Sequence, residues 1–250
     1  EPIPLQSSIW MRMAAAIILL AVIGFAVLQI VRSSADITYY AEESGAVVEL
    51  PDGSTVVLNA ASELTYPKSF DGDDSRAISL SGEAFFEVQH DSAHPFIVEL
   101  EGASVEVLGT SFNIEAYKNN PDIQVVVATG KVKLASNTEN TSVVLQKGDR
   151  GTYLKDNNQV IQEMNTDVNF LAWKTGQLVF EDMSLDLVIQ TLNKLYDTNI
   201  IITAASAENC RVTVSFDQQS LEATLAVLEA TLGLTYVEQG DSIEIVKTGC

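Results

Sequence analysis

Residues 47–58 read VVELPDGSTVVL and place two apolar-rich runs on either side of Pro51-Asp52-Gly53-Ser54. An Asp-Gly step between two such runs is a strong sequence signal for a β-hairpin. Similar short runs, separated by Gly, Asp, Asn and Pro, continue from about residue 37 to residue 164. Roughly a dozen strands at this spacing are typical of a sandwich, a barrel or a solenoid-like stack. The sequence therefore predicts an all-β domain, solenoid-like or a sandwich, over residues 36–172.

The periodicity changes after Asp167. Ser184 precedes apolar residues at helical spacing, a strand follows at residues 200–202, and the same unit recurs downstream. Serine is a favoured residue at a helix N-cap, which supports a helix start at each position. The matching positions of the two units are Phe180, Ser184, Leu185, Ile189 and Leu192, then Phe216, Ser220, Leu221, Leu225 and Leu228. Two βαβ-type repeats predict a small α/β domain over residues 173–250.

Residues 9–31 read IWMRMAAAIILLAVIGFAVLQIV, interrupted only by Arg12 and Gln29. At about 1.5 Å per residue such a helix crosses the roughly 30 Å hydrocarbon layer. We expect a retained transmembrane helix over 9–31 with a short stub at 1–8. A cleaved signal peptide ending at Ser33-Ser34-Ala35 is one alternative, although a signal core usually has about 7–15 residues. A buried soluble helix is another. Arg12 and Arg32 balance each other, so local charge does not set the orientation.

The net charge of −20, from 14 Lys+Arg and 34 Asp+Glu, limits the partners. Nucleic-acid binding depends on cationic surface, so we expect no nucleic-acid partner. Attachment to anionic lipid through basic patches is disfavoured for the same reason. With 46% hydrophobic and 19% charged residues, the chain is not a disordered one.

Two short segments are candidates for metal binding. His90-Asp91-Ser92-Ala93-His94 offers two imidazoles and a carboxylate, but it lies in a predicted loop before Pro95, where the histidines need not converge. Asp71-Gly72-Asp73-Asp74 lacks the remaining ligands of a calcium loop. We interpret both as solvated turns. We therefore predict no catalytic, cofactor-binding or metal-binding residues, no cofactor, and a protein that is not an enzyme.

The chain has two cysteines, Cys210 and Cys250. An oxidising compartment would allow them to form a disulfide. Because Cys250 is the last residue, we expect two unpaired thiols instead.

Several motifs in order along the chain resemble the FecR family of transmembrane anti-sigma regulators. They are LPDGS at 50–54, LSGEAFFEV at 80–88, PFIV at 95–98, VLGTSFN at 107–113, GKV at 130–132 and WKTGQLVF at 173–180. The duplicated unit is similar to the small domain shared by secretins and the N-termini of TonB-dependent receptors. The sigma-binding cytoplasmic helices of the family are not among these residues.

The resemblance implies a single-pass inner-membrane protein with residues 1–8 in the cytoplasm and the bulk of the chain in the periplasm. It implies an all-β FecR-like domain at 36–172 and a signalling domain at 173–250. Its partners would be the signalling domain of an outer-membrane TonB-dependent receptor and, through the absent N-terminal part, an extracytoplasmic-function sigma factor. The inducing ligand, iron chelate or glycan, and the choice between inhibiting and activating the sigma factor stay open.

Two other functions remain as alternatives. One is a membrane-anchored periplasmic module that binds a glycan or another envelope component without signalling, and the other is a glycoside-active enzyme on a β scaffold. For the signalling function, a small open sheet must leave edge strands that can accept a partner strand. We expect this receiving edge at residues 234–237 or 242–246.

Overall fold

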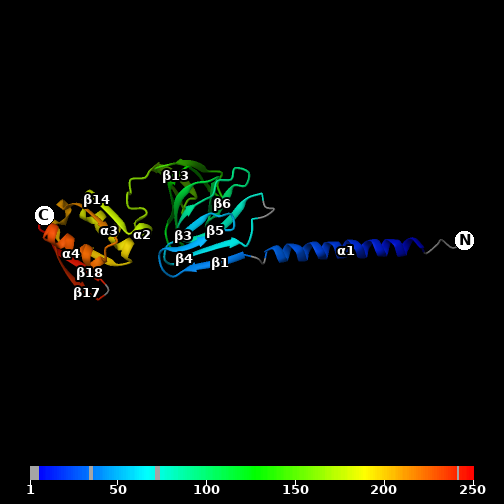
Figure 1. Cartoon of the computed structure of the whole chain (residues 1–250), viewed down its shortest axis with the longest axis horizontal. Helices are drawn as coiled ribbons and strands as arrows, with labels where there is room; N and C mark the ends of the chain where they lie inside the picture. Colours follow the sequence, from blue (N-terminus) through cyan, green and yellow to red (C-terminus); the bar gives the residue numbers. More distant parts are fainter. Residues whose placement is uncertain (1–5, 34–35, 71–73, 241) are drawn as a thin grey trace.

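The computed structural model describes residues 6–33, 36–70, 74–240 and 242–250. A helix, a β domain and a small α/β domain follow one another in chain order (Figure 1). Each domain is built around its own apolar core, with members between residues 41 and 153 in the first and between residues 172 and 245 in the second.

The N-terminal helix α1 covers Gln6–Ser33 and so includes the whole predicted span of residues 9–31. Its side chains are described for residues 12–25, and the large apolar ones among them, from Met13 to Phe25, are exposed. Within the described residues, no helix has the length and hydropathy that crossing a membrane requires. The ends of the predicted span lie outside the described side chains.

The β domain confirms the prediction of an all-β fold. Its strands are β1 Asp36–Ala41, β2 Ala46–Glu49, β3 Thr55–Leu58, β4 Ser62–Pro67, β5 Arg76–Glu87, β6 Phe96–Glu99, β7 Ala103–Val107, β8 Ser111–Ala116, β9 Asp122–Thr129, β10 Lys131–Ser136, β11 Ser142–Gln146, β12 Asp149–Leu154 and β13 Gln159–Met164. They form one 13-stranded sheet whose main path is β11-β10-β7-β6-β5-β8-β9-β12-β13. The hairpin predicted at residues 47–58 is β2–β3, in antiparallel register.

The sheet bends into a nearly closed barrel, so neither a solenoid-like stack nor two separate sheets describes it. The 12-residue strand β5 makes the bend. Its first part pairs with β4 and β6, and its second part pairs with β3 and β8. The change of partners falls at Gly82, which has φ +113° and where a Cβ would come within 2.6 Å of the Ser62 Cα. Only glycine fits this approach without strain.

Aromatic side chains fill the barrel. Phe86, Phe96 and Phe112 are fully buried, and the rings of Phe86 and Phe112 stack with centroids 5.0 Å apart. At one side Arg76 is buried against the Phe96 ring and pairs with Asp52, 2.6 Å from Nη1 to Oδ2. A buried charge of this kind is tolerated because it is paired and hydrogen-bonded.

The α/β domain contains α2 Ala172–Thr175, β14 Gln177–Ser184, α3 Leu185–Tyr196, β15 Asn199–Ile202, the 3₁₀ helix η1 Ala205–Asn209, β16 Arg211–Asp217, α4 Leu221–Leu232, β17 Thr235–Gln239 and β18 Ser242–Lys247. Ser184 and Ser220 are N-caps, as predicted, and their hydroxyls accept bonds from the amides of Leu187 and Ala223. Both predicted helices are therefore confirmed.

The pairing of the strands corrects the prediction of two βαβ-type repeats. The first strands of the two repeats, β14 and β16, pair with each other in antiparallel fashion, and β15 pairs in parallel with β18. Neither repeat therefore pairs its own two strands with each other. This arrangement brings Phe180 and Phe216 together edge to face, with centroids 6.3 Å apart.

Cys210 and Cys250 form a disulfide, so the expectation of two unpaired thiols is wrong. The C-terminal tail is held in place although Cys250 is the last residue. Thr248 is buried, and the amide of Gly249 donates to the carbonyl of Leu232 at the end of α4, at 2.8 Å. This fold-back brings Cys250 to the fully buried Cys210.

Candidate functional site

The strand order in the three-stranded sheet of the C-terminal domain corrects one part of the prediction for the receiving edge. The sheet order is β15-β18-β17, so β18, which contains residues 242–246, is the central strand and cannot receive a partner. β17, which contains most of 234–237, is an outer strand, and four of its five residues are exposed. One side of β17 therefore has no strand partner among the described residues.

The neighbouring two-stranded sheet is protected differently. The side chain of Asn169, in the segment before α2, bonds both backbone groups of Val179 on β14, at 2.8 and 2.9 Å. This side chain takes the place of a further strand along β14. Of the outer strands β14 and β17, β17 is therefore the more accessible to a partner strand.

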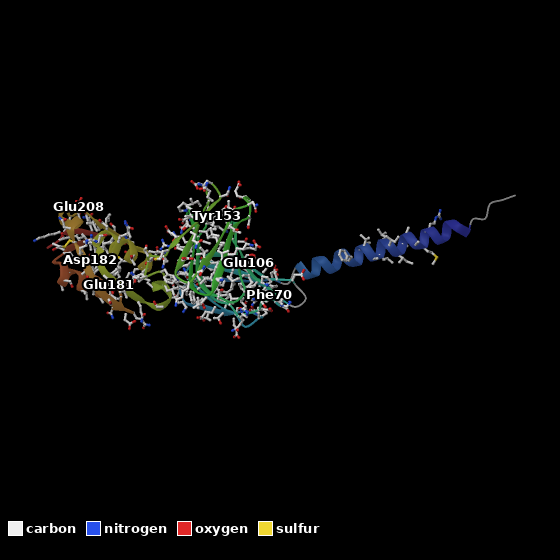
Figure 2. The ribbon with its side chains drawn as sticks, turned by 90° about the horizontal axis from the view of Figure 1, so that it is seen from above. Phe70, Glu106, Tyr153, Glu181, Asp182 and Glu208 are labelled. Carbon is white, nitrogen blue, oxygen red and sulfur yellow. A yellow bond between two sulfur atoms is a disulfide. The ribbon has the colours of Figure 1, made fainter. Side chains whose placement is uncertain are left out.

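The surface of the C-terminal domain is acidic. Glu181 and Asp182 on β14 and Glu208 in η1 lie at the end of the molecule far from α1 (Figure 2).

A polar cluster lies where the two domains meet, and its centre is Glu83 on β5. The carboxylate is buried, and its two oxygens accept bonds of 2.8 Å from the side-chain amides of Asn59 and Asn113. Across the seam, Lys194 on α3 donates to Glu115 on β8. We call Glu83, Asn59, Asn113, Glu115 and Lys194 the seam cluster.

The protonation of the seam cluster follows from its burial and charges. Burial raises the pKa of Glu83, and the nearby Lys194 ammonium partly opposes this effect. Partial loss of contact with water lowers the pKa of the half-exposed Lys194, but the charges of Glu83 and Glu115 outweigh this effect and leave that pKa raised. Burial and the charge of Glu83 raise the pKa of Tyr117 to about 12. Lys194 is therefore charged at neutral pH and faces acidic groups of the other domain.

Two hollows lie beside the seam cluster. One is an open cleft of about 400 Å³, which both domains line with polar side chains such as Tyr117, Asn120 and Asp197. The other is a cavity of about 70 Å³ against Trp173, whose buried indole N–H has no hydrogen-bond partner among the described residues. Several polar groups of the open cleft already bond within the protein, as in the bonds from Asn120 to Glu115 and from Tyr117 to the carbonyl of Ala60.

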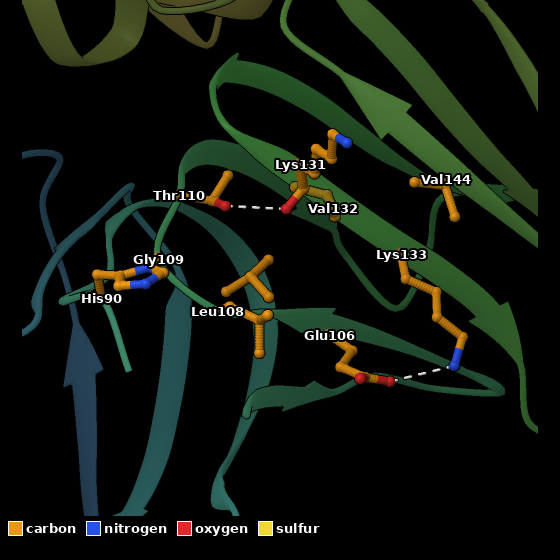
Figure 3. Close-up of a pocket in the computed structure, with 10 residues that line it drawn as sticks. His90, Glu106, Leu108, Gly109, Thr110, Lys131, Val132, Lys133 and Val144 are labelled. Carbon is orange, nitrogen blue, oxygen red and sulfur yellow. Dashed lines mark hydrogen bonds and ion pairs between the residues drawn. The ribbon is translucent and has the colours of Figure 1, made fainter. Parts of the chain in front are cut away.

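A shallow groove of about 330 Å³ lies on the outside of the β domain (Figure 3). Lys133 pairs with Glu106 at 3.1 Å, and the Thr110 hydroxyl donates to the carbonyl of Lys131 at 2.9 Å. His90 lies against Gly109 at one end. The side chains of Lys133 and Glu106 are thus paired with each other, and none of these groups forms a nucleophile-and-base arrangement.

The structure separates the residues of the histidine segment. His94 Nδ1 lies 2.7 Å from Asp91 Oδ2, whereas His90 lines the groove. The bond from His94 lowers the pKa of Asp91 to about 2. In the described part of the chain, no group of three or more His, Cys, Asp or Glu side chains is placed to hold a metal ion. Residues 71–73 of the other candidate lie outside the described residues.

Sequence reasoning did not predict the seam cluster. In the sequence Glu83 is part of the motif LSGEAFFEV, and nothing in its spacing connects it to Lys194 more than a hundred residues later. The one signal in the sequence is that Glu83 lies directly before the apolar residues 84–86 of a predicted strand.

Two domains with separate cores and an accessible outer strand fit a protein that acts through contacts with other proteins. Comparison with known proteins gives the family. The FecR protein model matches residues 38–133, and the model of the FecR C-terminal domain matches residues 177–245. The chain belongs to the FecR family. This family is non-enzymatic, in agreement with the prediction that the protein is not an enzyme.

Solved structures agree with this assignment. Two crystal structures of a candidate anti-sigma factor from Parabacteroides distasonis ATCC 8503, at 2.50 and 1.65 Å resolution, are 30% identical to the chain. The similarity covers 85% of this chain and 99% of that one, with a TM-score of 0.64. No curated protein matches the chain significantly.

Proposed function

We propose that this chain is the signal-receiving part of a FecR-type anti-sigma regulator. In this function α1 anchors the protein in the inner membrane, and residues 36–250 lie in the periplasm. The C-terminal domain receives a signal from the signalling domain of an outer-membrane TonB-dependent receptor. The output reaches an extracytoplasmic-function sigma factor on the cytoplasmic side of α1. The observation that carries the proposal is the family match over both domains, in the same order.

The open edge of β17 supports the placement of the receiving surface. An added strand gains affinity from main-chain hydrogen bonds and specificity from alternate side chains. A charged side chain on an edge strand is a common obstacle to such pairing. Val237 on β17 and Ile201 on β15 are comparably exposed, at 39% and 46%, and lie on the two outer strands of one sheet.

This pair of positions gives a matched test. We expect Val237→Lys to weaken binding of the cognate receptor's periplasmic signalling domain by roughly tenfold, which corresponds to about 1.4 kcal/mol. Ile201→Lys, the control, should leave the affinity unchanged, and binding should weaken as salt rises. If both variants and the native chain bind the signalling domain with equal affinity, the receiving surface does not lie on β17. Absence of binding to the native chain would refute the proposed function.

The membrane anchor has its own test. Protease added to spheroplasts should digest residues 36–250 and leave α1 with the membrane, because the apolar side chains described along α1 are exposed. Protection of residues 36–250 in intact spheroplasts would contradict this topology.

The alternative function, binding of a glycan or another envelope component without signalling, is favoured by one observation. The open cleft of about 400 Å³ has the size of a small-ligand site, lies between two domains and is lined by polar groups. Calorimetric titration of the full chain with envelope oligosaccharides tests this alternative function. Saturable heat that Asn120→Ala removes would support this function, and absence of heat would exclude these ligands.

A further inference from the structure

The two domains touch without sharing an apolar core. The members of the first core all come from residues 41–153, and those of the second all come from residues 172–245. Hydrophobic burial therefore stabilises each domain separately, and the buried Phe85, which belongs to neither core, lies under Lys174 where the domains meet. Domains with separate cores are expected to move relative to each other unless their interface is large and hydrophobic or specific contacts hold them.

The specific contacts at the seam come from two lysines of the C-terminal domain. Lys194 on α3 donates to Glu115 and faces the buried Glu83, and Lys174 on α2 lies 4.7 Å from the ring centroid of Phe85. Lys174 makes a cation–π contact, which is a weak interaction at an exposed site. Lys194, with two carboxylates in reach, is the stronger of the two.

The Lys194 contact can open at low cost to the β domain. The Lys194 side chain is 57% exposed, so water can replace its partner readily. Glu83 keeps its bonds to Asn59 and Asn113 when Lys194 leaves, because both amides belong to the β domain. The acceptor half of the contact is thus preformed and does not depend on the C-terminal domain.

Lys194 is also connected to the outer strand β17. The residue before it, Asn193, bonds both backbone groups of Ile200 on β15, at 2.7 and 2.9 Å. β15 pairs with β18, and β18 pairs with β17. A partner strand added to β17 therefore acts on a sheet whose other side holds the α3 end that carries Lys194.

We propose that Lys194 is a releasable latch between the two domains, and that a partner on β17 releases it. With the latch closed, the ammonium on α3 holds the C-terminal domain against Glu83 and Glu115 in one orientation. When the contact opens, the C-terminal domain can change its orientation relative to the β domain. Binding of a partner to β17 thus affects the β domain. The release step rests on the proposed function, whereas the latch does not.

The latch is tested with the full chain in detergent micelles. Spin labels at Glu139→Cys in the β domain and Glu229→Cys on α4 report the interdomain distance, since the native cysteines are paired with each other. Both labelled positions are exposed. We expect one narrow distance distribution in the native chain and loss of that narrow distribution in Lys194→Met.

Lys133→Met is the matched control. Lys133 is also half-exposed and paired with a glutamate, but both residues lie in the β domain. The interdomain distance distribution of Lys133→Met should remain narrow. Unchanged melting of both domains in Lys194→Met shows that the variant folds. An equally narrow distribution in Lys194→Met and the native chain would overturn the latch.

Addition of the receptor's signalling domain tests release. Broadening of the native distribution, with no further change in Lys194→Met, supports release by the partner. Binding that leaves the native distribution narrow overturns the release step while the proposed function stands. Absence of binding refutes the proposed function and the release step together, and the comparison of Lys194→Met with Lys133→Met still decides the latch.

Discussion

The two domains of this protein differ in whether their sheets leave strand edges open. The β domain bends one 13-stranded sheet almost into a closed barrel around stacked aromatic rings. The C-terminal domain divides five strands between a two-stranded and a three-stranded sheet, and it depends on helices and a disulfide to complete its core. Closure removes edges, and open sheets keep them. In the proposed function, the first domain is therefore the scaffold and the second carries the binding surface.

The largest expected effect is the loss of an aromatic ring from the β core. Phe86 is fully buried and stacks on Phe112, so Phe86→Ala should destabilise the β domain by about 3–5 kcal/mol. We propose that residues 36–172 and 173–250 unfold as separate units, because their cores are separate. Denaturant titration followed by hydrogen exchange should therefore show the shift in 36–172 only. A parallel shift in both domains would contradict this separation.

The next effect concerns the C-terminal domain alone. A disulfide that closes a loop with a sequence separation of 40 constrains the unfolded chain, and its removal should cost about 2–4 kcal/mol. The double variant Cys210→Ser/Cys250→Ser should lower the melting temperature of residues 173–250. Reductant should lower it in the native chain but not in the variant. If reductant does not change the melting temperature of the native chain, the disulfide-linked C-terminal tail contributes little to the stability of this domain.

A smaller effect is expected at the helix caps. Ser184 and Ser220 accept bonds from the amides of Leu187 and Ala223, and Ser→Ala at an N-cap typically costs about 1 kcal/mol. Each substitution should shift the denaturation midpoint of the C-terminal domain by a similar amount. Ser142→Ala, at an exposed position on β11, is the control and should have no effect.

The smallest effect is a pH dependence in the loop of the β domain. The hydrogen bond from His94 lowers the pKa of Asp91 to about 2, below the usual aspartate value of 3.8. A carboxyl with a lowered pKa stabilises the folded state above its unfolded pKa and loses that contribution as the pH falls through the folded value. Carboxyl titration by NMR should give a midpoint near 2 for Asp91, and His94→Ala should return it toward 3.8. No change in His94→Ala would assign the shift to the backbone amides instead.

Local patterns predicted the elements of the structure well. The hairpin at residues 47–58, the all-β character of the first domain and the capped helices after Ser184 and Ser220 each depend on nearby residues, through turn geometry, alternation and helical spacing. The family resemblance also followed from short motifs, because turns and core positions keep a recognisable order along the chain. These features are determined by the sequence itself.

Tertiary structure decided which elements meet. Distant parts of the chain are joined by the pairing of β14 with β16, the central place of β18, the close approach of Gly82 to Ser62 at the bend of β5, the Cys210–Cys250 disulfide and the contact of Lys194 with the β domain. Periodicity describes which face of a strand is buried but does not identify its neighbour. The neighbour is selected by the packing of whole cores and by the backbone groups that each sheet leaves to be satisfied, and both are properties of the assembled fold.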